Sequence, residues 1–366
     1  MIPIYKPQIS KKAHKYVKDC MDSTWISSQG TYIKKFETAL AKFHNMKYCV
    51  VTSSCTTSLH LSILSLGLKR GDEVICSALS FIAPANMVLL SNLKLVLVDI
   101  NSKTLNIDEN KIEEKISKKT KAIIVVHQFG HSANMKKIIQ LKKKYNLKVI
   151  EDNAESIGGK FYNKLNGTMS DLSTLSFFAN KIITTGEGGA ILTNNKKLYE
   201  KCLEMRDHGM DRNKRYFHKF IGFNYRMTNL QAAIGFSQIK EIQSILKRRN
   251  HQMEHYYKLL SNNKNYKPRE FEKWCKPVHW LTTIILNKKK YRNKLISFLK
   301  RKKIDSRQMV NPINDALHIK KLIKKKYPVA NDISKRSIHL PSGLELSKKD
   351  INYIILMLNS FFQNEH

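Results

Sequence analysis

The chain has 366 residues, of which 42% are hydrophobic, and a formal net charge of +36 at pH 7. This length and apolar content fit a folded globular protein with one large and one smaller domain. No apolar run reaches the roughly 18 residues that a membrane-spanning helix needs, and the proline-containing start has no signal-peptide core. These features argue against membrane and secreted classes, so we expect a cytoplasmic protein.

The positive charge makes nucleic-acid binding an alternative, but it remains a minority hypothesis. Lysines are spread over the whole length, no zinc-finger or RNP pattern accompanies them, and runs such as residues 142–144 indicate solvated helix faces. We instead interpret the charge as a compositional habit of the source, with attraction of an anionic small substrate as its useful consequence. The six cysteines have no CxxC spacing, so we expect reduced, mostly buried thiols and no metal site.

The first fifty residues predict two helices and a short strand. The segment through Pro7 is extended, because proline disfavours helix at the residue before it. Apolar periodicity predicts helices over residues 11–21 and 32–44, with a loop over residues 25–30 between them. Residues 48–52 then form a short strand.

A hydroxyl-rich segment follows this strand. Five of the six residues 53–58 carry a hydroxyl group, and they open an apolar-periodic helix. An ordinary helix cap needs only one hydroxyl. The free N–H groups and the dipole of a helix start also bind anions, so the segment modestly favours a phosphate site.

Strands and helices alternate through the next hundred residues. Residues 122–126 form a near-continuous apolar run, typical of a strand buried on both faces of a parallel sheet. This alternation predicts an open α/β sheet with crossover helices, whose ligands lie beyond the carboxyl ends of the strands. The predicted strands cover residues 73–76, 93–99, 122–126 and 147–150, and helices begin near residues 86, 106 and 135.

Lys181 is the residue around which we interpret the chain. It lies just before a turn with three glycines, residues 186, 188 and 189, and five residues after Ser176. Glycines permit sharp backbone turns. A lysine held there away from water is a candidate Schiff-base amine, although a surface lysine is the simpler interpretation of this stretch alone.

The C-terminal part predicts a second unit. A long helix runs from residue 229 towards 259, a polar stretch covers residues 261–276, and strand 282–286 and helix 291–302 follow. We predict a large domain over residues 10–245 and a small domain over residues 246–366, joined by the N-terminal segment 1–9.

The lysine, a carboxylate at a strand end and the hydroxyl-rich helix start are all used by one cofactor. Pyridoxal 5′-phosphate needs a lysine amine, a carboxylate for its ring nitrogen, a phosphate cradle and an aromatic side chain on the ring face. Lys181, Asp152 at a strand end and the helix start at residues 54–57 suit these roles. Asp152 could otherwise be a helix cap, but it lies where ligands of such sheets are bound.

An ordered set of motifs makes the family recognisable. The chain resembles the sugar-nucleotide aminotransferases of fold-type I (aspartate aminotransferase-like), the group that includes the perosamine synthases, over nearly its whole length. The matching segments are WISS (25–28), GDEV (71–74), FIAPAN (81–86), EDNAES (151–156), SFFANK (176–181), GEGG (186–189), GFNYRM (222–227) and LPS (340–342).

The resemblance implies a fold and residue roles. We expect a large domain with a mostly parallel sheet of the seven-stranded type and a smaller C-terminal α+β domain. Lys181 would carry the cofactor and move the proton. The cofactor would also contact Cys55 (through its backbone), Thr56, Phe81, Asp152, Glu155, Ser176 and, from a neighbouring subunit, Asn224.

The resemblance implies fewer residues for the substrate than for the cofactor. The resemblance places Arg307, Trp25 and Ser27 with the sugar nucleotide, and it implies a homodimer with active sites at the subunit interface. Relatives have glycine where Cys55 stands, and aromatics and a histidine where this chain has Met309, Val310 and Asn314. The residues at positions 212–215 are further candidates for an anion, whereas His127 and His131 receive no role, and Thr185 and Glu187 are expected to shape the loop.

We therefore expect conversion of a nucleotide-linked 4-keto-6-deoxy sugar to its 4-amino sugar, with L-glutamate as donor. The alternatives are a 3-keto sugar aminotransferase, a dehydratase, and a non-catalytic regulator with the same fold. Dehydratases of this family have histidine in place of the lysine, so Lys181 argues against that alternative.

Overall fold

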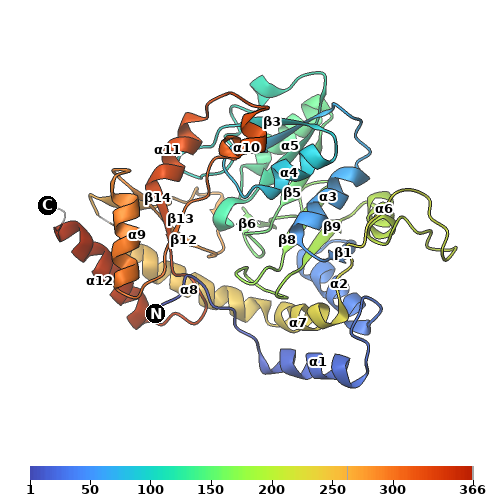
Figure 1. Ribbon diagram of the computed structural model, residues 1–366, viewed down its shortest axis with the longest axis horizontal. Coiled ribbons are helices and arrows are strands. Elements are labelled where there is room, and N and C mark those ends of the chain that lie inside the picture. The colour runs from blue at the N-terminus through green and yellow to red at the C-terminus, as the bar shows by residue number, and fades with distance from the viewer. Residues whose placement is uncertain (262, 365–366) are drawn as a thin grey trace.

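The main body of the protein is built on a seven-stranded sheet. The computed structural model describes residues 1–261 and 263–364 (Figure 1). Four neighbouring strand pairs of the sheet are parallel, whereas β9 runs antiparallel to both of its neighbours. The strand order is β1 (Tyr48–Thr52), β9 (Gly189–Thr193), β8 (Leu172–Ser176), β5 (Lys148–Asp152), β4 (Thr120–Val126), β2 (Glu73–Ser77), β3 (Lys94–Val98).

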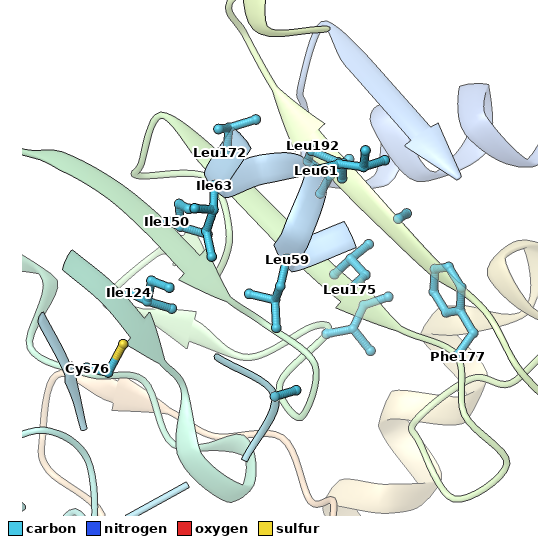
Figure 2. Packing of buried hydrophobic residues seen from close by; sticks show 14 of the residues in the cluster. Leu59, Leu61, Ile63, Cys76, Ile124, Ile150, Leu172, Leu175, Phe177 and Leu192 are labelled. Atoms are coloured by element: carbon cyan, nitrogen blue, oxygen red, sulfur yellow. The ribbon is translucent and has the colours of Figure 1, made fainter. Parts of the chain in front are cut away.

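Helices cover both faces of this sheet. Along β4, Ile124 packs in the same cluster as α3, while Ile123 and Val125 pack with Ile138 of α5 on the other face. Figure 2 shows Leu59, Leu61 and Ile63 of α3 against the strands. Burial on both faces explains the unbroken apolar run. The helices of this part are α1 (Lys11–Asp22), α2 (Thr31–His44), α3 (Cys55–Ser65), α4 (Ala83–Leu90), α5 (Met135–Tyr145), α6 (Lys196–Arg206) and α7 (Asn229–Lys240).

A smaller antiparallel sheet lies beside the first, in the order β10 (Tyr266–Pro268), β12 (Thr282–Leu286), β14 (Ser337–Leu340), β13 (Arg307–Gln308). It has its own apolar cluster, to which the C-terminal helix contributes Ile354 and Leu358. The associated helices are α8 (Ile242–Leu260), α9 (Tyr291–Arg301), α10 (Leu317–Lys320), α11 (Pro328–Arg336) and α12 (Lys348–Asn364). A three-stranded sheet of β11 (Cys275–Lys276), β6 (Lys160–Phe161) and β7 (Lys164–Leu165) completes the strands of the described residues.

The predicted fold class, a large mostly parallel sheet with a smaller α+β unit, is confirmed. The domain boundary between residues 245 and 246 remains a prediction, and residues 262, 365 and 366 of the predicted small domain lie outside the described part. Helix α8 runs across this boundary, with Ile245 packed in the large cluster and Tyr256 in the small one. The N-terminal segment pairs Ile2 with Ile304 of the smaller unit.

Two local predictions are wrong. No helix begins at Asn106; the chain instead makes a three-residue 3₁₀ turn, η1 (Glu113–Lys115). The buried Asn106 side chain donates to the carbonyl oxygens of His131 and Ser132 at 3.2 and 3.1 Å, so tertiary hydrogen bonds fix this segment. The long helix from residue 229 is two helices, because the chain turns at Glu241, whose N–H bonds to the Gln238 carbonyl.

All six cysteines are free and five of them are buried, which agrees with the predicted reduced thiols. Among the described helices, none is both long and apolar enough to cross a bilayer.

Candidate active site

A cavity of about 480 Å³ opens at the carboxyl ends of the parallel strands. The end of β5, the end of β8 and the first residues of α3 form part of its wall, as the position rule for α/β sheets predicts. Eight of the predicted site residues line this cavity: Cys55, Thr56, Phe81, Asp152, Glu155, Ser176, Lys181 and Arg307. Residues far apart in sequence are therefore brought to one place.

The amine of Lys181 lies inside the cavity between a carboxylate and an aromatic face. Its Nζ is 3.7 Å from Oε1 of Glu155 and 3.8 Å from the ring centroid of Trp280. The lysine side chain is 13% exposed, so it is shielded from bulk water but open to the cavity. The simpler interpretation, a surface lysine, is therefore excluded.

Asp152 ends strand β5 and is 5% exposed. Burial raises the pKa of its carboxyl, while the N–H of Ala154 and the positive charge of Lys181 lower it. Its Oδ1 accepts a hydrogen bond from that N–H at 3.0 Å. A carboxylate that is buried at such cost gains most from a cationic ring nitrogen placed against it.

Glu155 has the same electrostatic environment. Burial raises the pKa of its carboxyl, and Lys181 lowers it. Its Oε2 accepts a hydrogen bond from the Phe129 N–H at 2.7 Å, which leaves Oε1 directed at Lys181. The two carboxylates therefore come from the end of β5 and the residues just after it, and the charge of Lys181 lowers the pKa of both.

The start of α3 has the geometry of an anion site. Ser54 and Thr57 form a reciprocal capping box, which satisfies the N–H groups of these two residues. The N–H groups of Cys55 and Thr56 lack a carbonyl one turn earlier in the helix, and both residues face the cavity. Ser176 lines the same region. This arrangement suits a phosphate group.

Gly189 allows this helix start to lie against β9. A Cβ atom at this position would lie 2.4 Å from the Ser54 carbonyl and 2.6 Å from the Cys55 nitrogen. Only glycine permits so close a backbone approach. The GEGG motif therefore shapes the predicted phosphate cradle as well as the turn.

The turn after Lys181 is held by hydroxyl groups. Thr184 Oγ1 donates to the Phe177 carbonyl at 2.9 Å, and Thr185 Oγ1 donates to the Glu187 carbonyl. Thr185 therefore has the loop-shaping part that we expected. Glu187 lines the cavity as well.

Two histidines near the site are structural in this chain. His127 accepts the Ala133 N–H at Nδ1 and therefore donates from Nε2 to Glu151 Oε2, 2.9 Å away. Burial lowers the pKa of His131 to about 3, and its ring packs beside Phe271 and Trp274. Neither histidine lines the cavity.

Several predicted site residues lie elsewhere. Trp25 and Ser27 belong to the loop before α2, where their carbonyl oxygens accept hydrogen bonds from Asn229 at 2.6 and 2.7 Å. Asn224 is exposed and bridges to Asp207. These three are not among the residues that line the cavity of their own subunit. Their predicted roles stay predictions, as do those of the exposed residues 212–215.

One wall of the cavity is aromatic, and no sequence motif predicted it. Trp280, Phe129 and His339 line the cavity, and the rings of Phe129 and Trp280 stack with centroids 6.0 Å apart. Trp280 follows the polar stretch at the predicted domain boundary, and no motif marks it. Trp280 reaches the cavity together with Arg307 and His339, which belong to the smaller sheet, so its role depends on tertiary packing.

Comparison with known proteins agrees with this geometry. The model of the DegT/DnrJ/EryC1/StrS aminotransferase family matches residues 7–359. The GDP-perosamine synthase of Escherichia coli O157:H7 is 39% identical over 367 residues, covering 100% of this chain and 99% of that one.

Solved structures give the same result. An aminotransferase of pseudoaminic acid biosynthesis from Helicobacter pylori superposes with a TM-score of 0.94 at 29% identity and 99% coverage of both chains. A mutant GDP-4-keto-6-deoxymannose-3-dehydratase with bound GDP-perosamine superposes with a TM-score of 0.92 at 25% identity, covering 98% of this chain and 100% of that one.

Proposed function

The chain belongs to the DegT/DnrJ/EryC1/StrS aminotransferase family, and on this premise we propose that it aminates a nucleotide-linked 4-keto-6-deoxy sugar. The product would be the 4-amino-4,6-dideoxy sugar, with pyridoxal 5′-phosphate as cofactor and L-glutamate as amino donor. The observation that carries the proposal is Lys181, enclosed between Glu155 and Trp280 in a cavity that also holds Asp152 and the start of α3.

The residues present fit the cofactor. Asp152 would pair with the ring nitrogen, and the N–H groups of Cys55 and Thr56 with the Ser176 hydroxyl would hold the phosphate. Phe81, 61% exposed at the cavity wall, would cover a face of the ring. When bound, the cofactor would supply an aldehyde carbon that takes up and releases the amino group, and a ring that withdraws electrons from it.

The chain supplies the proton transfer. With the cofactor bound, Lys181 Nζ would accept and return the proton that amino transfer requires. Glu155, 3.7 Å away, stabilises the positive charge that this amine acquires. The walls formed by Trp280 and Phe129 exclude water from the amine, because their rings occupy that side of the cavity.

The choice of a 4-keto sugar is supported by the GDP-perosamine synthase relative. Arg307 and Val310 line the cavity, and they would contact the sugar nucleotide. Met309, one of the positions that departs from the family pattern, is fully buried in the core. That departure therefore affects packing rather than the substrate surface, whereas the departure at residue 310 faces the cavity.

We also propose a homodimer. Ile221 is a large apolar side chain that is 87% exposed, and Phe81 and Phe178, which line the cavity, are 61 and 45% exposed. A second copy that covered them would bring its Asn224 to its neighbour's cavity, as the resemblance predicts. The cytoplasmic location likewise remains a prediction.

The test is a substrate panel. The protein is incubated with pyridoxal phosphate, glutamate and a set of 4-keto and 3-keto sugar nucleotides, and aminated product is scored by mass. We expect product from a 4-keto sugar and none with Lys181→Ala. Product from 3-keto sugars alone would overturn the C-4 assignment, and no cofactor absorbance band with added pyridoxal phosphate would overturn the enzyme assignment.

A further inference from the structure

The loop that carries Lys181 is held by two side chains that are far apart in the sequence, Tyr5 and Trp280. The Trp280 indole N–H donates to the Asn180 carbonyl at 2.7 Å, and the Tyr5 hydroxyl donates to the Lys181 carbonyl at 2.6 Å. Two successive carbonyl groups of the loop are thus fixed from outside it. Within the loop, the Lys181 N–H bonds to the Phe178 carbonyl at 2.9 Å.

One buried guanidinium connects the two donors. Arg249 of α8 is fully buried; its Nη2 donates to the Tyr5 hydroxyl and its Nη1 donates to the His279 carbonyl at 2.9 Å. His279 is the residue before Trp280. Arg249 therefore holds the Tyr5 ring and the backbone that presents Trp280 at the same time.

Trp280 also contacts the amine itself. Its ring centroid is 3.8 Å from Lys181 Nζ, and the ring is 5% exposed. A cation above an indole face in a desolvated site is attracted by the negative face of the ring. The stacked Phe129 ring keeps the indole in place. Trp280 thus restrains Lys181 in two ways. Its indole N–H holds the carbonyl of the preceding residue, Asn180, and its ring contacts the lysine amine.

We propose that Tyr5, Arg249 and Trp280 form a lysine clamp, which positions the Lys181 loop so that its amine meets the cofactor. These are positioning residues, because they act through Lys181. The clamp couples the N-terminal segment and the smaller unit to the reacting amine. This inference rests on the proposed function, in which Lys181 binds pyridoxal phosphate.

The experiment measures the reactivity of Lys181 directly. The full chain is mixed with pyridoxal phosphate, sampled over time, reduced with borohydride and digested, and the Lys181 peptide is quantified by mass. Exposed lysines such as Lys143 provide an internal control in every sample, because the clamp does not touch them.

The variants are Tyr5→Phe, Trp280→Phe and the double variant. Each single variant removes one hydrogen bond to the loop and keeps an aromatic ring. Tyr5→Phe also removes the acceptor of Arg249 Nη2, and Trp280→Phe places a smaller ring beside Lys181 Nζ. We expect each to slow modification of Lys181 by roughly threefold to tenfold, the size of one lost hydrogen bond. The double variant should slow it by less than the product of the two factors, because either loss frees the same loop. We also expect a shifted absorbance maximum of the bound cofactor and a fall in kcat larger than the change in KM.

Two control variants lose comparable groups elsewhere. Tyr266→Phe removes a buried hydroxyl bonded to Asn359 at 2.9 Å, and Trp274→Phe changes an indole that does not line the cavity. Both should leave Lys181 modification unchanged. If Tyr5→Phe does not fold, Trp280→Phe with its control tests the clamp alone.

The outcomes separate the two claims. If wild-type Lys181 reacts no faster than exposed lysines, the proposed function fails. The clamp is overturned, while the proposed function stands, if wild-type Lys181 reacts selectively and the clamp variants react at the same rate. The same holds if the double variant slows modification by the full product of the two single-variant factors.

Discussion

Oε1 of Glu155 lies 3.7 Å from Nζ of Lys181, and the two side chains are 6 and 13% exposed. The other carboxylate oxygen of Glu155 accepts the Phe129 N–H. The carboxylate is thus held by the backbone and faces the amine with its remaining oxygen. A lysine in such a place has one partner fixed and one side open to the cavity, which is what a reacting amine requires.

Asp152→Asn should stabilise the cofactor-free protein and weaken the enzyme. Burial raises the pKa of Asp152 above 3.8, so the folded protein binds more protons than the unfolded chain. The stability of the wild type therefore falls as pH rises from about 3.8 through the folded pKa. Asparagine does not titrate. The melting temperature of the Asp152→Asn variant should therefore exceed that of the wild type at neutral pH, and this difference in melting temperature should vanish in acid.

The same substitution should lower transamination by on the order of 100-fold, because the ring nitrogen loses its ionised partner. Thermal melts of the cofactor-free protein between pH 4 and 8, followed by assays with cofactor, check both parts. A variant with lower melting temperature at neutral pH would show that the Asp152 charge stabilises the fold instead.

Phe81→Ala should affect cofactor binding and spare the fold. The ring is 61% exposed, so its truncation leaves no large buried cavity. Loss of one aromatic face should weaken pyridoxal phosphate binding by roughly threefold to tenfold. Equilibrium titration of the absorbance band measures this affinity. The matched control is Phe217→Ala, 48% exposed and outside the lining of the cavity, which should bind the cofactor like the wild type.

Most of the cofactor site was predictable, because its residues occupy short motifs at strand ends. Asp152 ends a strand whose apolar pattern is readable, and the sheet rule then places it at the ligand-binding edge. Lys181 follows β8 by five residues, and its family motif, not the strand pattern, identified it. Trp280 and Tyr5 were not predictable in this way. Their contacts with the Lys181 loop span 100 and 176 residues of sequence and depend on how the smaller unit packs.

The failed helix at Asn106 has a similar cause. Its local sequence suits a helix start, but the buried amide bonds to three backbone groups of residues 128, 131 and 132. Buried polar groups have to be satisfied, so these tertiary bonds override the local preference. Helix α3 was predicted correctly because its cap, Ser54, is local.

Gly189→Ala should be more damaging than Gly186→Ala. A Cβ at residue 189 would lie 2.4 Å from the Ser54 carbonyl, so the start of α3 must move. At residue 186 nothing lies within 4 Å, and the cost is the left-handed backbone, φ +81°, at about 1 kcal/mol. Thermal melts and pyridoxal phosphate titrations of both variants make the comparison. Equal cofactor affinity in the two would contradict the close approach as the determinant of the phosphate cradle.

Glu151→Gln should destabilise the protein, although Glu151 is not among the residues that line the cavity. Glu151 is fully buried and accepts hydrogen bonds from His127 Nε2 at 2.9 Å and from the N–H groups of Gly167 and Met169 at 2.9 and 2.8 Å. Burial opposes its ionisation, but these donors together lower its pKa below 4.5. An amide in this place would direct its own N–H at one of the donors.

We expect a loss of about 3 kcal/mol at neutral pH, the upper range for hydrogen bonds to a charged group. Since the pKa of Glu151 is lowered in the folded state, its contribution is present above pH 4.5 and is lost as pH falls through the folded pKa. The gap between variant and wild type should therefore narrow in acid. Denaturant unfolding of the cofactor-free protein at several pH values measures it, with the exposed Glu254→Gln as control. A gap that stays constant below pH 4 would mean that shape, and not the carboxylate charge, makes Glu151 necessary.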